Sequence, residues 1–241
     1  MSAQTGPRVM AAGILVLISL VSRCPGAPQN EDASRSPIYR GIAVLSSSIG
    51  HDVTRDEVLA LVRTCKLNLV VIDFGWVTYH WPRTDPAAVA QLAQTLRQAG
   101  VETALMYRPR AMTRTDADVH YAVDEEGAIA EHHNELCFAY EDSCAWAAQW
   151  GTRLLRAYPT CDRVILYNVR ATCHCRRCRA GKGREYVARF LDRCRAEWQP
   201  TRAHLLIGHV GLADEYAANT DFLCPFIAVQ RDGKTPVDAE T

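Results

Sequence analysis

The stretch Leu67-Asn-Leu-Val-Val-Ile72 is an apolar run of strand length with a single polar interruption. Runs of this kind are typical of strands that are buried on both faces, as in a parallel sheet. Similar runs occur elsewhere in the chain, at Ile42–Leu45, Val101–Met106, Val164–Tyr167, Leu205–Ile207 and Phe226–Val229. The sequence therefore predicts about six buried parallel strands.

The segments between these runs carry the signals of amphipathic helices. Thr54-Arg-Asp-Glu57 is a capping box, and the apolar positions behind it share one face, with Cys65 expected in the core. Asp85-Pro86 predicts an N-cap followed by proline at the first helical position, and Gly100 marks the end of that helix. A longer helix is predicted from Cys137 to Tyr158. Another carries the stripe Val187, Phe190, Leu191, Cys194 and Trp198.

Alternation of strands and helices predicts an α/β fold with a parallel sheet, either open or closed into a barrel. No glycine-rich phosphate-binding motif follows a strand, which favours a (β/α) TIM-type barrel. A closed barrel needs eight βα units, so about six units indicate an incomplete barrel or a fragment. The alternative is that the polar, histidine-rich stretch Ala111–Glu135 hides further strands, although it has the composition of a long loop.

Composition and the N-terminal segment indicate an exported globular protein. The chain has 241 residues, 48% of them hydrophobic, with 27 basic and 27 acidic side chains, which argues against a polyanion-binding surface over the whole chain. Residues 1–27 resemble a signal peptide, because Arg8 precedes an apolar run that is too short for a membrane span. We predict cleavage near Ala27, a linker over 28–37, a barrel domain over 38–241, and a secreted or periplasmic location without a stable membrane span. A retained N-terminal anchor is the alternative.

The cluster Cys173-His-Cys-Arg-Arg-Cys178 is the sharpest local signal in the sequence. Three thiols within six residues suit one tetrahedral zinc ion, and Cys137, at the start of the preceding helix, is the predicted fourth ligand. A site closed by sulfur ligands would be structural. The alternatives are disulfides, a redox-active pair of thiols, or His174 in place of one cysteine. Cys144 and Cys161 form another pair that could be a disulfide or an alternative source of metal ligands, and Cys224 is unassigned.

The segments Glu135-Leu-Cys-Phe-Ala-Tyr140, Tyr158–Asn168 and Cys173–Arg179 together resemble barrel glycoside hydrolases, in particular family-42 β-galactosidases and their uncharacterised relatives. In that group a cysteine after strand 3 and a C-x-C-x-x-C motif after strand 4 bind a structural zinc. The likeness covers roughly residues 38–198 and implies a TIM-type barrel, O-glycosyl hydrolysis and an oligo- or polysaccharide partner.

The expected catalytic pair is missing from its family positions. In the resembled group a glutamate preceded by asparagine ends strand 4, whereas this chain reads Tyr167-Asn-Val-Arg170 there. The nucleophile of the group lies on strand 7, and the apolar runs stop after a sixth strand. An active enzyme would therefore take its carboxylates from Asp73, which ends the second predicted strand, or Glu135.

Trp76, Tyr107, Arg108 and Asn168 are the predicted substrate-binding residues. Trp76 follows Asp73, with Tyr79, His80 and Trp81 close behind, and such rings can line a sugar platform. Tyr107 and Arg108 end the third strand and Asn168 ends the fourth. The structural alternatives are that Asp73 caps its loop, that the aromatic rings pack at the rim of the barrel, and that Arg108 is a solvated loop residue.

Two other function classes remain open. The missing strand-4 carboxylate favours a non-catalytic glycan-binding protein or a truncated remnant of a glycosidase. The segment from Arg170 to Arg195 holds nine basic side chains against Glu185 and Asp192, as a basic zinc module that binds nucleic acid would. Stacking aromatic residues are missing between its cysteines, so nucleic acid is not the expected partner.

Overall fold

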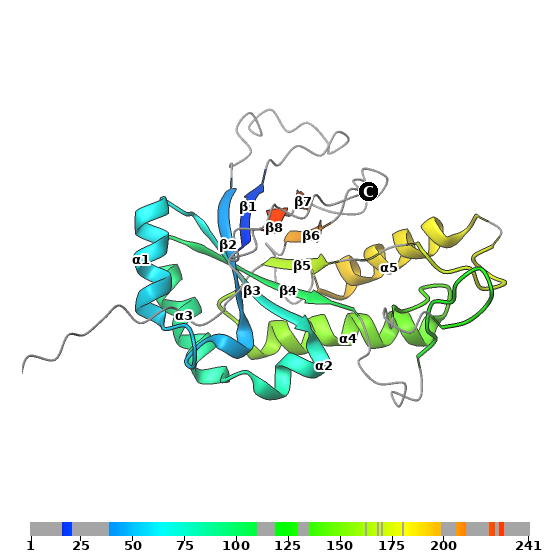
Figure 1. Cartoon of the computed structure of the whole chain (residues 1–241), viewed down its shortest axis with the longest axis horizontal. Helices are drawn as coiled ribbons and strands as arrows, with labels where there is room; N and C mark the ends of the chain where they lie inside the picture. The colour runs from blue at the N-terminus through cyan, green and yellow to red at the C-terminus, as the bar shows by residue number, and fades with distance from the viewer. Residues whose placement is uncertain are drawn as a thin grey trace, which may run out of the picture.

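The protein forms one curled sheet with helices along it (Figure 1). The computed structural model describes residues 16–20, 39–109, 119–129, 135–161, 163–167, 169, 171–179, 181–198, 206–210, 222–224 and 227–228. The strands are β1 (Val16–Leu20), β2 (Tyr39–Leu45), β3 (Leu69–Trp76), β4 (Glu102–Arg108), β5 (Arg163–Tyr167), β6 (Leu206–Val210), β7 (Phe222–Cys224) and β8 (Ile227–Ala228).

The strand order is β7-β6-β5-β4-β3-β2-β1-β8. From β2 to β7 each strand pairs in parallel with the next along the chain. β1 is antiparallel to both β2 and β8, and it also lies near β7, from the other end of the order. The sheet is thus curled towards closure, which confirms the predicted α/β class and its description as an incomplete barrel.

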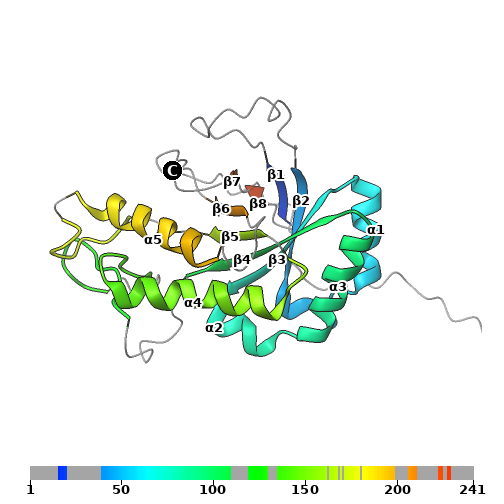
Figure 2. The same cartoon turned by 180° about the vertical axis from the view of Figure 1, so that it is seen from behind.

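The helices alternate with the parallel strands and lie along one face of the sheet, as Figure 2 shows from behind. They are α1 (Arg55–Cys65), α2 (Val77–His80), α3 (Pro86–Gln98), α4 (Glu141–Ala157) and α5 (Gly183–Trp198). None of the helices that the structure describes is both long and apolar enough to cross a membrane.

Side chains alternate between two faces of each central strand, and this alternation positions the site. On β3, Val70, Ile72 and Phe74 belong to the large core beneath the helices. Leu69 and Val71 belong to a smaller cluster on the opposite, inner face, together with residues of β2, β4 and β5. Since successive residues of a strand point to opposite faces, a shift of one position moves a side chain from the helix side to the inner side.

The capping signals in the sequence correctly predicted the starts of α1 and α3. Thr54 and Glu57 form the predicted capping box at α1, and the Asp85 carboxylate accepts hydrogen bonds from two backbone N–H groups at the start of α3. Two expectations were wrong: the burial of Cys65 and the start of the next long helix near Cys137. Cys65 is exposed, because the buried face of α1 consists of Val58 and Val62.

The helix predicted from Cys137 begins later, at Glu141. Residues 137–140 instead form a turn closed by the Tyr140 N–H and the Cys137 carbonyl. This turn holds Cys137 outside the helix, where its thiol faces the other cysteines of its cluster. Cys144 and Cys161 are both buried free thiols.

Part of the predicted signal peptide is seen in the fold. Val16–Leu20 forms β1 against β2, in the register Val16 to Ala43 through Leu20 to Tyr39. The predicted linker over 28–37 lies outside the described residues. Removal of residues 1–27 would take β1 away and leave that edge of β2 without its partner strand.

Gly151 marks the closest approach of α4 and α5, and we expect Gly151→Ala to destabilise the protein. A Cβ at this position would lie 2.2 Å from Cζ2 of the buried Trp198, whose indole N–H donates to the Ala148 carbonyl. Overpacking of this kind costs about 1–3 kcal/mol, which outweighs the gain of roughly 1 kcal/mol from alanine in a helix. Urea unfolding measures the difference. Equal or greater stability of the variant would contradict the packing described.

Candidate functional site

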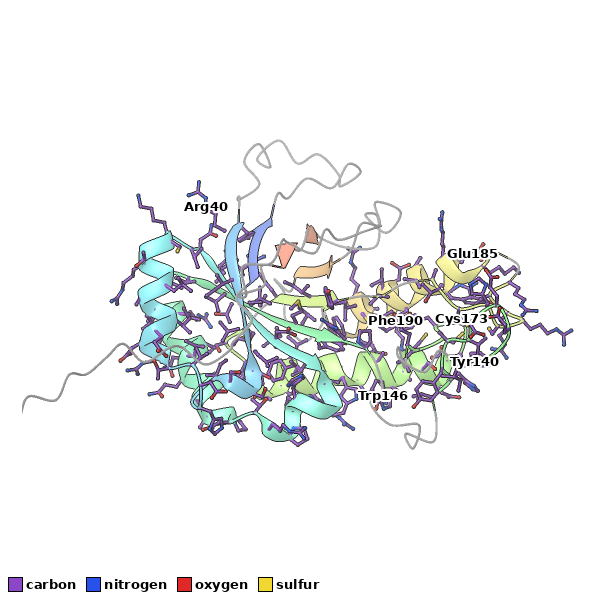
Figure 3. The ribbon with its side chains drawn as sticks, viewed as in Figure 1. Arg40, Tyr140, Trp146, Cys173, Glu185 and Phe190 are labelled. Carbon is purple, nitrogen blue, oxygen red and sulfur yellow. The ribbon has the colours of Figure 1, made fainter. Side chains whose placement is uncertain are left out.

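Four cysteines from two separate loops lie together at one end of the molecule. Cys137 precedes α4, and Cys173, Cys175 and Cys178 lie between β5 and α5. Figure 3 places Cys173 near Tyr140, beyond the first turns of α4 and α5 and far from α1. The structure thus brings together all four of the predicted metal ligands.

The sulfur positions fit one tetrahedral metal ion. All four Sγ atoms lie within 4.8 Å of one another, and Cys137 Sγ is 3.7 Å from both Cys175 Sγ and Cys178 Sγ. Four sulfurs about 2.3 Å from one zinc ion would be separated by roughly 3.8 Å. A disulfide needs about 2.05 Å, so the spacing matches metal ligation and does not match a bond between these thiols. The cluster could therefore bind a metal.

The cluster shares protons among its sulfurs. The hydrogen bond from Cys137 lowers the pKa of Cys173 to about 5 against the opposing effect of burial, and backbone hydrogen bonds from Val123 and Cys175 lower it further. Burial and contacts with the other thiols raise the pKa of Cys178 to about 12, and the hydrogen bond to Cys173 raises the pKa of Cys137. A metal ion would take the place of the remaining protons, since thiolates are the ligating form.

Hydrogen bonds outside the sulfurs tie the two loops together. The Arg177 guanidinium donates to the Ala139 carbonyl at 3.0 Å and lies 4.2 Å from the centre of the Tyr140 ring. The backbone N–H of His174 donates to Val123. His174 is not among the ligand groups that cluster within the described part of the chain.

A second group of polar side chains lies at the carboxyl ends of the central strands. Asp73 follows Leu69 and Val71 on the inner face of β3, and Arg108 follows Met106 on the inner face of β4. The Arg108 guanidinium lies 4.1 Å from the centre of the ring of Tyr167, which ends β5 on the same face. Substrates bind at this end of the strands in (β/α) barrels.

Asp73 has the surroundings of a carboxyl that favours its protonated form. Burial raises its pKa, while the hydrogen bond from the Gly75 backbone N–H at 2.6 Å and the positive charge of Arg108 act in the opposite direction. A raised carboxyl pKa at the carboxyl edge of such a sheet is the property that a general acid requires.

The other predicted substrate-binding residues have different positions. Tyr107 is fully buried on the helix side of β4, where its hydroxyl donates to the Ala147 carbonyl at 2.9 Å and its ring contacts Trp198. Its neighbours are those of a core residue, and its ring cannot reach a ligand on the inner face. The side chain of Trp76 and the whole of Asn168 lie outside the described residues.

Glu135 belongs to the cysteine-bearing loops. Its carboxylate accepts a hydrogen bond from Thr172 at 2.7 Å, and its backbone carbonyl accepts from Ala122. The carboxylate thus links the segment before Cys137 to the segment before Cys173. Its surroundings differ from those of Asp73, whose neighbours are Gly75 and Arg108.

The arginines of the basic segment make intramolecular contacts. Arg179 donates to the carbonyls of His174 and Glu125, and Arg193 pairs with both Glu141 and Glu197. These contacts hold the segment against the loop after β4 and the start of α4.

Sequence reasoning missed two residues near the carboxyl ends of the strands, Tyr167 and Ser47, and the contact between Ser47 and His80. Tyr167 ends its strand on the same face as Arg108, so strand alternation could have identified it. Ser47 and the pairing of Ser47 with His80 have no sequence signal, because the two residues are 33 positions apart and meet only through the sheet.

Comparisons with known proteins show low similarity. No protein-family model and no curated protein sequence matches the chain. The α-galactosidase from Lactobacillus brevis is similar in structure, with a TM-score of 0.47 and 14% identity over 71% of this chain and 27% of that one.

Two further solved structures have comparable values. The α-amylase from Geobacillus thermoleovorans, complexed with acarbose, has a TM-score of 0.46 and 8% identity over 64% of this chain and 39% of that one. A family GH13_31 enzyme has a TM-score of 0.46 and 10% identity over 70% of this chain and 46% of that one. The chain spans less than half the length of each structure.

Proposed function

We propose that the protein acts on carbohydrate as a glycoside-hydrolase-like barrel, with Asp73 as its general acid and with a structural zinc site. The observation that carries the proposal is the position of Asp73, Arg108 and Tyr167 at the carboxyl ends of three adjacent parallel strands, on the inner face. That edge is where (β/α) barrels bind and convert their substrates.

Each side chain has a distinct role in this proposal. The Asp73 carboxyl donates a proton to the glycosidic oxygen as the bond to the sugar breaks. Arg108 donates hydrogen bonds to sugar hydroxyls, and Tyr167 holds the guanidinium in place through its ring. Glu135 is the second carboxylate of the proposal, on the loop that leads to Cys137.

Zinc is the metal that we propose for Cys137, Cys173, Cys175 and Cys178. Sulfur ligands and the tetrahedral spacing suit zinc, and four protein ligands leave no open position for substrate. The ion would supply structure alone: it would fix the loop after β4 to the loop after β5. Zinc binding would also hold Glu135 and Thr172 in place, because they flank these cysteines and are hydrogen-bonded to each other.

A non-catalytic glycan-binding protein is the second candidate. It is favoured by the different surroundings of the two carboxyl groups, since Glu135 accepts from Thr172 whereas Asp73 accepts from Gly75 and lies near Arg108, and retaining hydrolysis needs two carboxyl groups about 5–5.5 Å apart. The same edge of the sheet would then bind sugars without cleaving them.

A panel of plant and algal polysaccharides and aryl glycosides tests the proposal. Reducing-sugar release by the purified protein is the expected result. A folded, zinc-loaded protein that releases no sugar but binds glycans on an array would establish the second candidate. Absence of both release and binding would contradict carbohydrate as the partner.

Export is proposed from the predicted signal peptide over residues 1–27. We expect a chain expressed with its own N-terminus in a secretion-competent host to leave the cell with a new N-terminus near Pro28. N-terminal sequencing of the exported protein is the measurement. An intact chain starting at Met1 in the membrane fraction would instead support a retained anchor.

A further inference from the structure

Ser47, Asp73 and His80 converge where β2 and β3 end. Ser47 lies in the 3₁₀ turn Ser46–Ser48 directly after β2, and His80 is the last residue of α2, which follows β3. The Ser47 hydroxyl oxygen is 3.1 Å from His80 Nδ1, and both side chains are half-buried. This hydrogen bond fixes the imidazole beside the strand that carries Asp73.

Gly75 leaves room for the imidazole on a side of its backbone that also faces the Asp73 carboxylate. Its φ of 49° is the left-handed conformation, and a Cβ there would lie 2.9 Å from Cδ2 and 3.1 Å from Nε2 of His80. The same point is 3.9 Å from Asp73 Oδ1. The Nε2 edge of His80 and the Asp73 carboxylate thus face the same small region of backbone, and any side chain at position 75 would push the ring away.

Burial favours the neutral form of both groups. Burial lowers the pKa of His80, and the positive charges of Arg83 and Arg108 lower it further. Burial raises the pKa of Asp73 against the opposing effects of the Gly75 N–H and Arg108. A carboxyl whose pKa is raised and an imidazole whose pKa is lowered suit the roles of proton donor and proton acceptor in acid–base catalysis.

We infer that His80 is the second acid/base group of the site and works with Asp73, while Ser47 is a positioning residue that orients the imidazole. The inference rests on the proposed carbohydrate function. It provides a proton acceptor on the β3 side of the site. Such a group is needed because Glu135 is hydrogen-bonded to Thr172 and the residue after β5 is Asn168, which is not a carboxylate.

The proton balance of this pair closes. With the Nδ1 proton donated to the Ser47 hydroxyl oxygen, His80 Nε2 takes a proton from water, and the water oxygen bonds to the anomeric carbon. The glycosidic C–O bond breaks, its electron pair stays on the leaving oxygen, and that oxygen takes the proton of Asp73. The proton on His80 then passes to the Asp73 carboxylate, so that one water is consumed and both groups return to their starting forms.

The test compares two glycine variants on the full chain. Gly75→Ala places a Cβ against the His80 ring, whereas Gly100→Ala, also at positive φ (73°), places its Cβ where no atom lies within 4 Å. We expect Gly75→Ala and His80→Gln to lower kcat on aryl glycosides by about 100-fold with little change in KM, and Gly100→Ala to leave kcat unchanged. Ser47→Ala should lower kcat less and leave KM unchanged.

A readout independent of turnover is the NMR titration of the His80 imidazole. We expect Asp73→Asn and Gly75→Ala to shift that titration and Gly100→Ala to leave it in place. Wild-type kcat in His80→Gln, or an unshifted titration in Asp73→Asn, would overturn the inference and leave the proposed function standing. A wild-type protein that releases no sugar defeats the proposed function itself, and the catalytic role of His80 with it.

Discussion

Replacement of Cys137 by serine is expected to abolish zinc binding and to destabilise the protein strongly. Cys137 is the only one of the four clustered cysteines that comes from the loop before α4, so its loss uncouples that loop from the segment 173–178. When the free zinc concentration is a thousandfold above the Kd of the site, zinc binding contributes about 4 kcal/mol to stability. The midpoint of thermal unfolding should accordingly fall on the order of 10 °C.

Cys144→Ser is the matched control for this experiment. Cys144 is also a buried free thiol close in sequence, but its thiol donates to the Phe138 carbonyl and does not belong to the cluster. Native mass spectrometry should find about one zinc per chain in wild type and in Cys144→Ser, and none in Cys137→Ser. Alkylation should reach the four clustered thiols only after treatment with a strong chelator. Equal zinc content in all three proteins would refute the assignment.

The strands from β2 to β6 and the cysteine site could be predicted from the sequence because each has a short-range signal. The run Leu67–Ile72 covers the first half of β3, and the spacing of Cys173, Cys175 and Cys178 predicts their convergence. The strands β1 and β7 were not predicted, and Phe226–Val229, expected to be parallel, contributes β8, which is antiparallel to β1. The fourth cysteine was found from its expected place at the start of a helix, and it lies in the turn just before that helix.

The face of each residue on a fully buried strand could not be predicted. Tyr107 and Arg108 follow Ala104-Leu-Met106, where apolar residues occupy both faces of the strand, so no alternation of apolar and polar residues leads up to them to separate inner from outer positions. The structure places Tyr107 beneath α4 and Arg108 beside Tyr167. The Ser47–His80 contact was likewise invisible, because it depends on how the turn after β2 lies against the segment after β3.

Asp73→Asn separates catalysis from stability more sharply than any other substitution in the site. Asparagine keeps an oxygen that can accept the Gly75 N–H, but it has no proton to give to a leaving oxygen. We expect kcat on polysaccharide substrates to fall by about 10²–10⁴-fold while glycan affinity is largely kept. Unchanged sugar release in this variant would exclude Asp73 as the general acid.

The stability of the same variant should depend on pH in a defined direction. Because burial raises the pKa of Asp73 in the folded state, the folded protein holds this proton more tightly than the unfolded chain. Wild-type stability therefore falls as pH rises from the ordinary aspartate pKa, about 3.9, through the raised value of the folded state. Asparagine has no such titration, so the free energy of unfolding of Asp73→Asn relative to wild type should increase between pH 4 and pH 7. Urea unfolding at the two pH values measures this difference. A relative stability that decreases would show that the carboxylate is stabilised in the fold, as a nucleophile or a salt-bridge partner of Arg108 would be, and a constant value would show that folding does not shift this pKa. Either result would contradict the raised pKa expected of a proton donor.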